Sequence, residues 1–222
     1  MSTLLAENAV LQELIETRTA YNQAGQPISM HSNIPLPFAE ALYQTVLAQR
    51  PAIAIEIGMA FGISTLSILT ALRSLNGGRL ISIDPVQSST WQGCGAAAVE
   101  RAGLQYFHQL IEEPDYTALP QLLRTGCQVD FAYIDGWHTF DYTLLDFWYL
   151  DKMMQVGGIV GFNDCDWPAI DKAIRFVLSH RRYEEVNVGL RSIEPTAQCP
   201  CEDRYFRKLE HWEPKWDFFA EF

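Results

Sequence analysis

Acidic side chains follow two apolar runs in the second half of the chain. Asp135 comes directly after one run, and Asn163, Asp164 and Asp166 come after the next. Carboxyl ends of parallel strands meet at one edge of a sheet, so we expect these side chains to share a crevice. Asp135 and Asp164, with Asn163 or Asp166 as a third ligand, supply oxygen atoms suited to Mg²⁺ or another divalent ion.

A histidine lies close to the first of these acids. His138 is three residues after Asp135, where an imidazole can accept a proton from a substrate hydroxyl. We therefore predict His138 and Asp135 as catalytic residues. The alternative is that His138 merely begins a helix and that the acids cap helices, as Asp166 before Trp167 and Pro168 would.

A glycine loop follows an apolar run earlier in the chain, from Glu56 through Gly58 and Gly62 to Ser64. Glycine after a buried strand lets the backbone turn tightly and lets a ligand approach closely. The dinucleotide fingerprint has three glycines, G-x-G-x-x-G. The present G-x-x-x-G lacks the third, which fits a nucleoside ligand without phosphates such as S-adenosylmethionine. The alternative is that the glycines only satisfy turn geometry.

Two further acidic positions follow the next two apolar runs. Asp84 can accept hydrogen bonds from both hydroxyls of a ribose. Glu112 or the adjacent Glu113 can face the amino group of an adenine. The alternative for all three is an exposed loop acid.

These residues need a parallel sheet to bring them together. Apolar runs alternate with helical patterns, which predicts an α/β fold with a mostly parallel seven-stranded sheet and helices on both faces. The expected strands are 52–57, 79–83, 105–111, 129–134, 159–162, 183–188 and 204–209. The expected helices of this region are 64–75, 92–102, 116–124, 140–154 and 169–180, after an earlier helix at 38–49.

The chain shows no repeats or low-complexity linker, which favours one domain over residues 1–222. Leu4, Leu11 and Leu14 recur at helical spacing, so we expect residues 1–50 to form an N-terminal helical cap. Residues 51–166 would form the cofactor-binding core, and residues 167–222 the acceptor side with the C-terminal strands.

Composition narrows the classes of partner. The 222 residues carry a formal net charge of −11 and show no long basic run, which disfavours nucleic acid. No signal peptide and no membrane-length apolar stretch is visible, so we expect no membrane partner and a cytoplasmic location. The five scattered cysteines indicate reduced thiols. Cys199 and Cys201 lack the second pair of a zinc site.

These motifs resemble a known family. From about Pro27 to Trp167 the chain is similar to the class I S-adenosylmethionine-dependent methyltransferases. Within that class it resembles the metal-dependent O-methyltransferases that act on catechols, caffeoyl-CoA and macrolide sugars. The segments that carry the resemblance are Glu56–Leu66, Ile83–Asp84, Tyr133–His138 and Gly157–Asp164.

The resemblance implies a Rossmann-like domain, a small-molecule acceptor and a homodimer joined through the N-terminal helices. Asp84 would hold the ribose of the cofactor, and Glu112 or Glu113 would lie beside its adenine. Asp135 and Asp164 would hold a divalent metal. The residues expected to line the methionine end of the cofactor are Glu56, Gly58, Gly62 and Ser64. Ala60 and Asp135 are further residues expected to bind the cofactor.

Two departures from the family pattern affect the reaction half of the site. His138 occupies the place where those enzymes often carry a lysine base. Cys165 follows Asp164 where the catechol-type pattern has asparagine, and Asn163 precedes it, so the third metal ligand stays open between Asn163 and Asp166.

The resemblance predicts transfer of a methyl group to a small molecule, with a hydroxyl as the expected acceptor. Two alternatives are an NAD-dependent oxidoreductase on a Rossmann fold and a non-catalytic ligand-binding domain on a methyltransferase scaffold. Tryptophans near strand ends and in the C-terminal tail either wall an apolar acceptor or fill the core. They are Trp91, Trp137, Trp167, Trp212 and Trp216.

Overall fold

A seven-stranded sheet forms the centre of the protein in the computed structural model, which describes residues 2–190 and 202–222. Its order is β5-β4-β3-β6-β7-β9-β8, and only β9 runs antiparallel to its neighbours. The strands are β3 (Ile53–Ile57), β4 (Arg79–Ile83), β5 (His108–Ile111), β6 (Val129–Ile134), β7 (Met154–Phe162), β8 (Tyr183–Val186) and β9 (Arg204–Lys208). The predicted α/β fold is confirmed.

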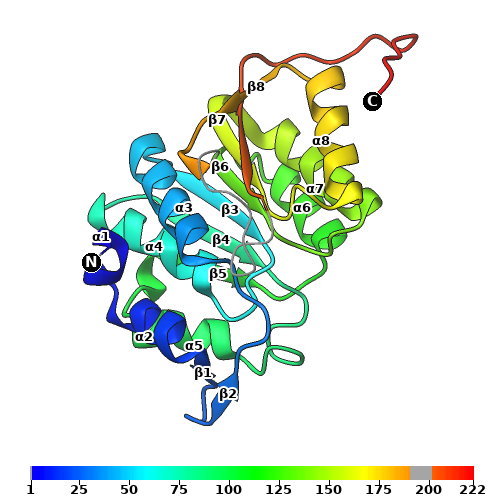
Figure 1. Cartoon of the computed structure of the whole chain (residues 1–222). Coiled ribbons are helices and arrows are strands. Elements are labelled where there is room, and N and C mark those ends of the chain that lie inside the picture. The colour runs from blue at the N-terminus through cyan, green and yellow to red at the C-terminus, as the bar shows by residue number, and fades with distance from the viewer. Residues whose placement is uncertain (1, 191–201) are drawn as a thin grey trace.

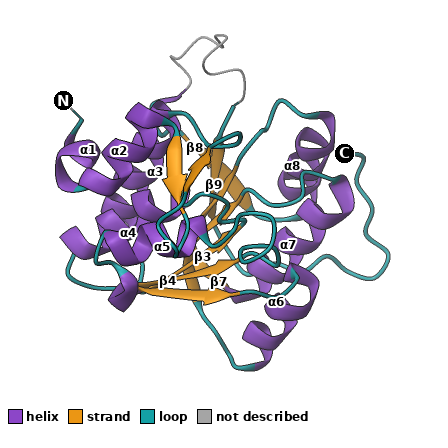
Figure 2. Cartoon of the chain, turned by 90° about the horizontal axis from the view of Figure 1, so that it is seen from below, coloured by secondary structure: helices purple, strands orange, loops and turns teal. Residues whose placement is uncertain are grey.

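Helices cover both faces of this sheet (Figures 1 and 2). The first five helices pack on one face, and the last three pack on the other. The helices are α1 (Thr3–Glu7), α2 (Ala9–Thr17), α3 (Leu36–Gln49), α4 (Ile63–Ser74), α5 (Cys94–Arg101), α6 (Asp115–Arg124), α7 (Phe140–Met153) and α8 (Pro168–His180).

Strand residues alternate between the two apolar layers because successive side chains point to opposite faces. In β3, Ala54 packs in the layer under α1–α5, whereas Ile55 and Ile57 pack under α6–α8. In β6, Phe131 and Ala132 divide in the same way. Burying a large apolar side chain such as Ile55 or Phe131 contributes about 1.5–3 kcal/mol, so both layers hold the strand ends in place.

The strand order reverses between β3 and β6. From β3 the chain moves outward through β4 and β5, then returns to place β6 on the other side of β3. The loops that leave β3 and β6 therefore diverge to opposite faces of the sheet and leave a crevice at their carboxyl ends.

The structure corrects several predicted element boundaries. A two-stranded hairpin, β1 (Thr19–Tyr21) with β2 (Pro27–Ser29), interrupts the expected helical cap. Residues 105–107 form a short 3₁₀ turn, so β5 begins at His108. Strand β7 begins at Met154, directly after α7, which is earlier than the apolar pattern predicted. The pair Cys199 and Cys201 lies outside the described residues.

A buried ion cluster joins α7 to the antiparallel edge of the sheet. The carboxylate of Asp151 accepts hydrogen bonds from Arg181 Nε and Tyr183 Oη, both at 2.9 Å. Lys208 Nζ lies 3.0 Å from Asp151 Oδ1. Asp151, Arg181 and Lys208 are each at most 5% exposed. The cluster therefore depends on one carboxylate to balance two buried cations.

Replacing Asp151 by asparagine should lower the free energy of unfolding by about 3 kcal/mol, because two buried cations lose their counter-charge. Urea unfolding measures the change. The control is Asp171→Asn, which breaks an exposed pair with Arg175 on α8 and should cost less than about 1 kcal/mol. Equal losses of unfolding free energy in the two variants would contradict the larger contribution expected of the buried cluster.

Candidate functional site

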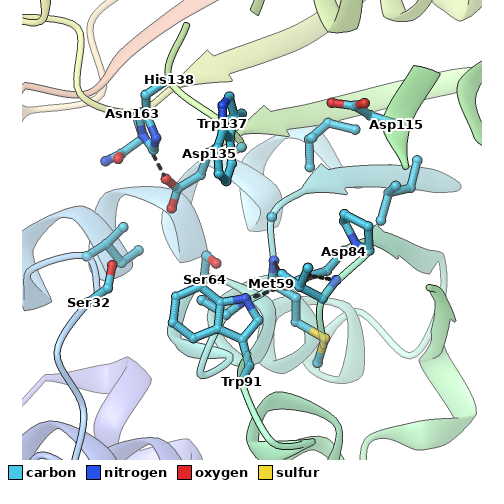
Figure 3. Close-up of a pocket in the computed structure, with 18 of the residues that line it drawn as sticks. Ser32, Met59, Ser64, Asp84, Trp91, Asp115, Asp135, Trp137, His138 and Asn163 are labelled. Carbon is cyan, nitrogen blue, oxygen red and sulfur yellow. Dashed lines mark hydrogen bonds and ion pairs between the residues drawn. The ribbon is translucent and has the colours of Figure 1, made fainter. Parts of the chain in front are cut away.

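A cavity of about 680 Å³ opens at the carboxyl ends of the parallel strands. Gly58 after β3, Asp84 after β4 and Asp135 after β6 all line it. Figure 3 shows Asp84 and Asp135 on opposite sides of this cavity, with Met59 and Ser64 between them. The topology thus brings together residues that are far apart in the sequence.

The loop after β3 packs directly on the loop after β6. Gly58 has φ +87°, and a Cβ atom there would lie 2.1 Å from the backbone oxygen of Asp135. Gly62, the residue before α4, has φ +89°. These conformations and this close approach require glycine at both positions. Ala60 adopts φ +47° between them, so the turn is tight throughout.

Asp84 organises this loop. Its Oδ2 accepts hydrogen bonds from the backbone nitrogens of Met59 (3.2 Å) and Ala60 (2.9 Å). Its Oδ1 accepts from the backbone nitrogen of Val86 at 3.0 Å. Asp84 is 2% exposed but borders the cavity. One carboxylate therefore fixes the loop and presents an edge to a bound molecule.

Glu56 lies beneath the loop and does not line the cavity. Its Oε2 accepts hydrogen bonds of 2.7 Å from the hydroxyls of Thr65 and Ser82. No described residue donates to Oε1. Burial raises the pKa of Glu56 to about 7, although the nearby hydroxyl groups of Ser64, Ser82 and Thr65 act in the opposite direction. A carboxyl group with a spare buried oxygen is thus held next to Ser64, which lines the cavity.

The acids after β5 are arranged differently from the prediction. Glu112 binds the backbone nitrogen and hydroxyl of Ser88 at 2.6 and 2.7 Å, and it lies outside the cavity lining. Glu113, also outside, accepts a hydrogen bond from Gln121. Asp115 at the start of α6 lines the cavity instead and is 7% exposed.

Asp146 on α7 lies beside Asp115. Burial, together with the charge and hydrogen bonding of Asp115, raises the pKa of Asp146 well above its usual value. Its oxygens find no conventional donor among the described residues. Two adjacent buried carboxyl groups cannot both ionise without cost, which is the physical cause of this raised pKa.

His138 lies between the two acids that were predicted to bind metal. Its Nε2 is 3.3 Å from Asp135 Oδ1 and 3.0 Å from Asp164 Oδ2 (Figure 3 draws the first of these contacts). Burial lowers the pKa of His138, but the proximity and charge of both carboxylates outweigh it and raise the pKa to about 10. His138 and Asp164 both adopt positive φ, of +55° and +53°. Such strain in side-chain-bearing residues is typical of functional sites.

The candidates for a third metal ligand point elsewhere. Asn163 lines the cavity, but its Nδ2 donates a hydrogen bond of 2.8 Å to buried Asp203. Asp166 is exposed and does not line the cavity. Within residues 2–190 and 202–222, no group of three His, Cys, Asp or Glu side chains is arranged to hold a metal ion.

Three of the six tryptophans line the cavity. Trp91 packs against Phe61, with ring centroids 5.2 Å apart. Trp137 is 71% exposed at the mouth, and Trp167 lies with its ring centroid 5.3 Å from that of His138. Trp212 and Trp216 lie outside the lining. Indole rings therefore form part of the cavity wall, and that of Trp167 lies next to His138.

Sequence reasoning missed several residues of this site. Residues 32–34, which precede α3, reach the cavity from the N-terminal region. Asp115, Tyr116 and Tyr142 line the side near α6 and α7. In the segment Pro114–Tyr116, the sequence offers one indication: an aspartate such as Asp115 is common in the first turn of a helix, so it marks where the loop after β5 ends.

A parallel sheet with a cavity at the point where strand order reverses defines a Rossmann-like α/β domain. A family model described as a methyltransferase domain matches residues 55–165, half of the 222-residue chain. The chain therefore belongs to this family of methyltransferase domains, which confirms the resemblance seen in the motifs.

A protein of Arabidopsis thaliana, named as a candidate caffeoyl-CoA O-methyltransferase, is 29% identical over 138 residues. The match covers 60% of this chain and 55% of that protein, so the chain spans about half the length of this relative.

Solved structures share the fold. An O-methyltransferase from Bacillus cereus in complex with SAH superposes with a TM-score of 0.71 at 16% identity, over 94% of each chain. The O-methyltransferase TomG from Streptomyces achromogenes, involved in tomaymycin synthesis and in complex with SAM, gives 0.68 at 16% identity. That match covers 92% of this chain and 91% of TomG.

The raised pKa of His138 predicts a specific pH dependence of stability. In the unfolded chain its pKa is near 6.5, and in the fold it is about 10. The stabilisation from its pairing is therefore complete below about pH 6.5 and is lost as pH rises through about 10. We expect the stability advantage of wild type over His138→Gln to shrink from about pH 6 to about pH 10, measured by urea unfolding. An advantage that grows with pH would show that folded His138 is neutral.

Proposed function

We propose that this protein is an S-adenosylmethionine-dependent methyltransferase that acts on a small molecule, with a hydroxyl as the methyl acceptor. The observation that carries the proposal is that Gly58, Asp84 and Asp135 border the same cavity. Membership of the methyltransferase domain family supports it, as do the O-methyltransferases that share the fold.

The cavity fits the cofactor by the chemistry of its lining. Asp84 offers carboxylate edges for the two ribose hydroxyls. Gly58 and Gly62 leave room for the methionine portion, and Ser64 offers a hydroxyl there. The unpartnered oxygen of Glu56 lies behind Ser64, where its negative partial charge would attract the positively charged ammonium and sulfonium groups of the cofactor.

For the adenine end, we propose Asp115 in place of Glu112. Asp115 borders the cavity, whereas Glu112 is engaged by Ser88. The side-chain oxygens of Asp115 can accept a hydrogen bond from the exocyclic amine of adenine. Trp137 at the mouth offers an indole face beside it.

The reacting groups would lie near His138. The bound cofactor would supply a methyl group on a positively charged sulfur. An acceptor oxygen attacks the methyl carbon in line with the carbon–sulfur bond, and the sulfur leaves. The described residues must orient that oxygen and manage its proton. Asp135 and Asp164 can accept the proton of an incoming hydroxyl, and the His138 imidazolium between them can offset charge that develops on oxygen. Direct proton uptake by His138 requires that it first release its own proton.

The predicted divalent metal remains a prediction, and this donor set does not fit it. The imidazole nitrogen of His138 occupies the space between the two carboxylates. The amide of Asn163 is turned to Asp203, and Asp166 is exposed. We therefore derive no step through a metal.

Some predictions from the sequence stay proposals. We propose one domain over residues 1–222, with the cap at 1–50, the core at 51–166 and the acceptor side at 167–222. We also propose a homodimer and a cytoplasmic location. Among the described residues, no helix is long and apolar enough to cross a membrane.

Asp84 offers the most direct test of cofactor binding. An asparagine there removes the charge and points an amide at backbone N–H groups, so each lost charge-assisted bond costs about 1.5–3 kcal/mol. We expect Asp84→Asn to weaken S-adenosylhomocysteine binding by at least about tenfold in calorimetry. The matched control, Glu112→Gln, should bind as wild type does.

NAD serves as the competing ligand in the same titration. No binding of S-adenosylhomocysteine by wild type would refute the proposed function. Tighter binding of NAD would refute it too and would favour the oxidoreductase alternative.

His138 tests the reaction half separately. We expect His138→Ala to lower turnover by about 10²-fold, because it removes the cation between the acids, while the Kd of S-adenosylhomocysteine is little changed. Methyl transfer from labelled cofactor to hydroxylated aromatic and sugar compounds measures turnover, with EDTA and with added Mg²⁺. Trp216→Phe, at a fully exposed site outside the cavity, is the control. Wild-type turnover in His138→Ala would remove this residue from the mechanism.

A further inference from the structure

We propose that Asp203 is a positioning residue, which holds Asp135 and Asp164 at the correct distance from His138. It directly precedes β9, far from the motifs in sequence and outside the cavity lining. The role rests on the proposed function, since it serves the reaction half of that site.

The side chain of Asp203 joins the two strands that carry the reacting acids. Tyr133 Oη donates a hydrogen bond of 2.8 Å to Asp203 Oδ2, and Asn163 Nδ2 donates one of 2.8 Å to Oδ1. Tyr205 Oη lies 3.4 Å from Oδ2. Asp203 is 3% exposed and Tyr133 is fully buried. Three neutral donors therefore converge on one buried carboxyl group.

The partners of Asp203 are next to the reacting residues in the chain. Tyr133 is two residues before Asp135 at the end of β6, and Asn163 directly precedes Asp164 at the end of β7. The backbone nitrogen of Asn163 also donates to Ile134 O at 3.0 Å. One side chain thus ties together both strand ends that present a carboxylate to His138.

Packing shows why the network forms at this place. A Cβ atom on Gly161 would lie 2.6 Å from the ring of Tyr205 and 3.0 Å from that of Tyr133. Glycine near the carboxyl end of β7 therefore lets both tyrosine rings lie across the strand, stacked with centroids 6.4 Å apart. Both hydroxyl groups then reach Asp203.

The backbone gives a reason for such an anchor. Asp164 adopts φ +53°, an unfavourable conformation for a residue with a side chain, and surrounding contacts must hold it. The amide of Asn163 is fixed by Asp203 on one side, and the nitrogen of Cys165 donates to Glu202 O at 2.7 Å on the other. Residues 202 and 203 therefore clamp Asp164 from both sides.

A buried polar group in an apolar layer is costly unless all its bonds are made. A contribution to overall stability does not explain why such a cluster is present, whereas positioning of Asp135 and Asp164 does. The reaction rate depends strongly on the positions of the catalytic residues, because a displacement of about 1 Å costs on the order of 10²-fold in rate.

The test compares the structures of wild type, Asp203→Ala and Asp203→Asn by crystallography. In the alanine variant we expect Asn163 to lose its anchor and the contact of 3.0 Å between His138 Nε2 and Asp164 Oδ2 to lengthen by about 1 Å or break. In the asparagine variant the amide oxygen can accept from Asn163 and the NH₂ can donate to Tyr133, so the contact should be kept.

A second variant covers the case in which Asp203→Ala does not fold. Asn163→Ala cuts the same link from the other end and should also lengthen the contact between His138 and Asp164. An unchanged contact in either alanine variant would overturn the proposal, as would a lost contact in Asp203→Asn.

Activity supplies a readout that a merely structural role would not move. We expect Asp203→Ala to lower kcat by at least about tenfold with little change in KM for the cofactor, and Asp203→Asn to restore most of kcat. Asp151→Asn is the matched control, since Asp151 is equally buried but lies in the cluster at the far edge of the sheet. It should lose stability without loss of kcat.

Equal loss of kcat in Asp151→Asn would overturn the positioning role. Failure of the proposed function is recognised independently, by the absence of S-adenosylhomocysteine binding in wild type.

Discussion

The close approach of two loops at the centre of the sheet is the constraint on which the site depends. Gly58 packs so tightly on the backbone oxygen of Asp135 that no side chain fits between them. This contact joins the loop proposed to hold the cofactor to the loop that carries Asp135 and His138. The reversal of strand order between β3 and β6 makes the contact possible, because it places both strand ends side by side.

Charge gives the two halves of the cavity different tasks. On the side of the glycine loop, Asp84 and Asp115 present acidic edges, and Glu56 holds a spare oxygen behind Ser64. On the other side, His138 is a cation held between Asp135 and Asp164. The raised pKa of His138 follows from these two carboxylates, which together outweigh the effect of burial. The acids thus determine the protonation of the imidazole.

Much of this arrangement could be predicted from the sequence. Short apolar runs with no alternation are typical of strands buried on both faces, and parallel strands bring their carboxyl ends to one edge. That reasoning predicts Gly58, Asp84, Asp135 and His138 around one cavity, and all four residues line it. It rested on topology and did not require the orientation of individual side chains.

The remaining features depend on side-chain orientation and on distant contacts. Glu112 and Asp115 are close in sequence, and only the packing of the loop after β5 decides that Asp115 borders the cavity. Asn163 was a candidate metal ligand, but Asp203, 40 residues later, turns its amide away. The hairpin β1–β2 was missed because each strand has only three residues.

The central claim is that this cavity holds S-adenosylmethionine with its reactive end toward His138. A crystal structure of the wild-type protein with S-adenosylhomocysteine tests it most directly. The account predicts the ribose hydroxyls on Asp84 and the sulfur on the side of Asp135 and His138. A ligand bound outside this cavity, or one whose sulfur faces away from His138, would contradict it.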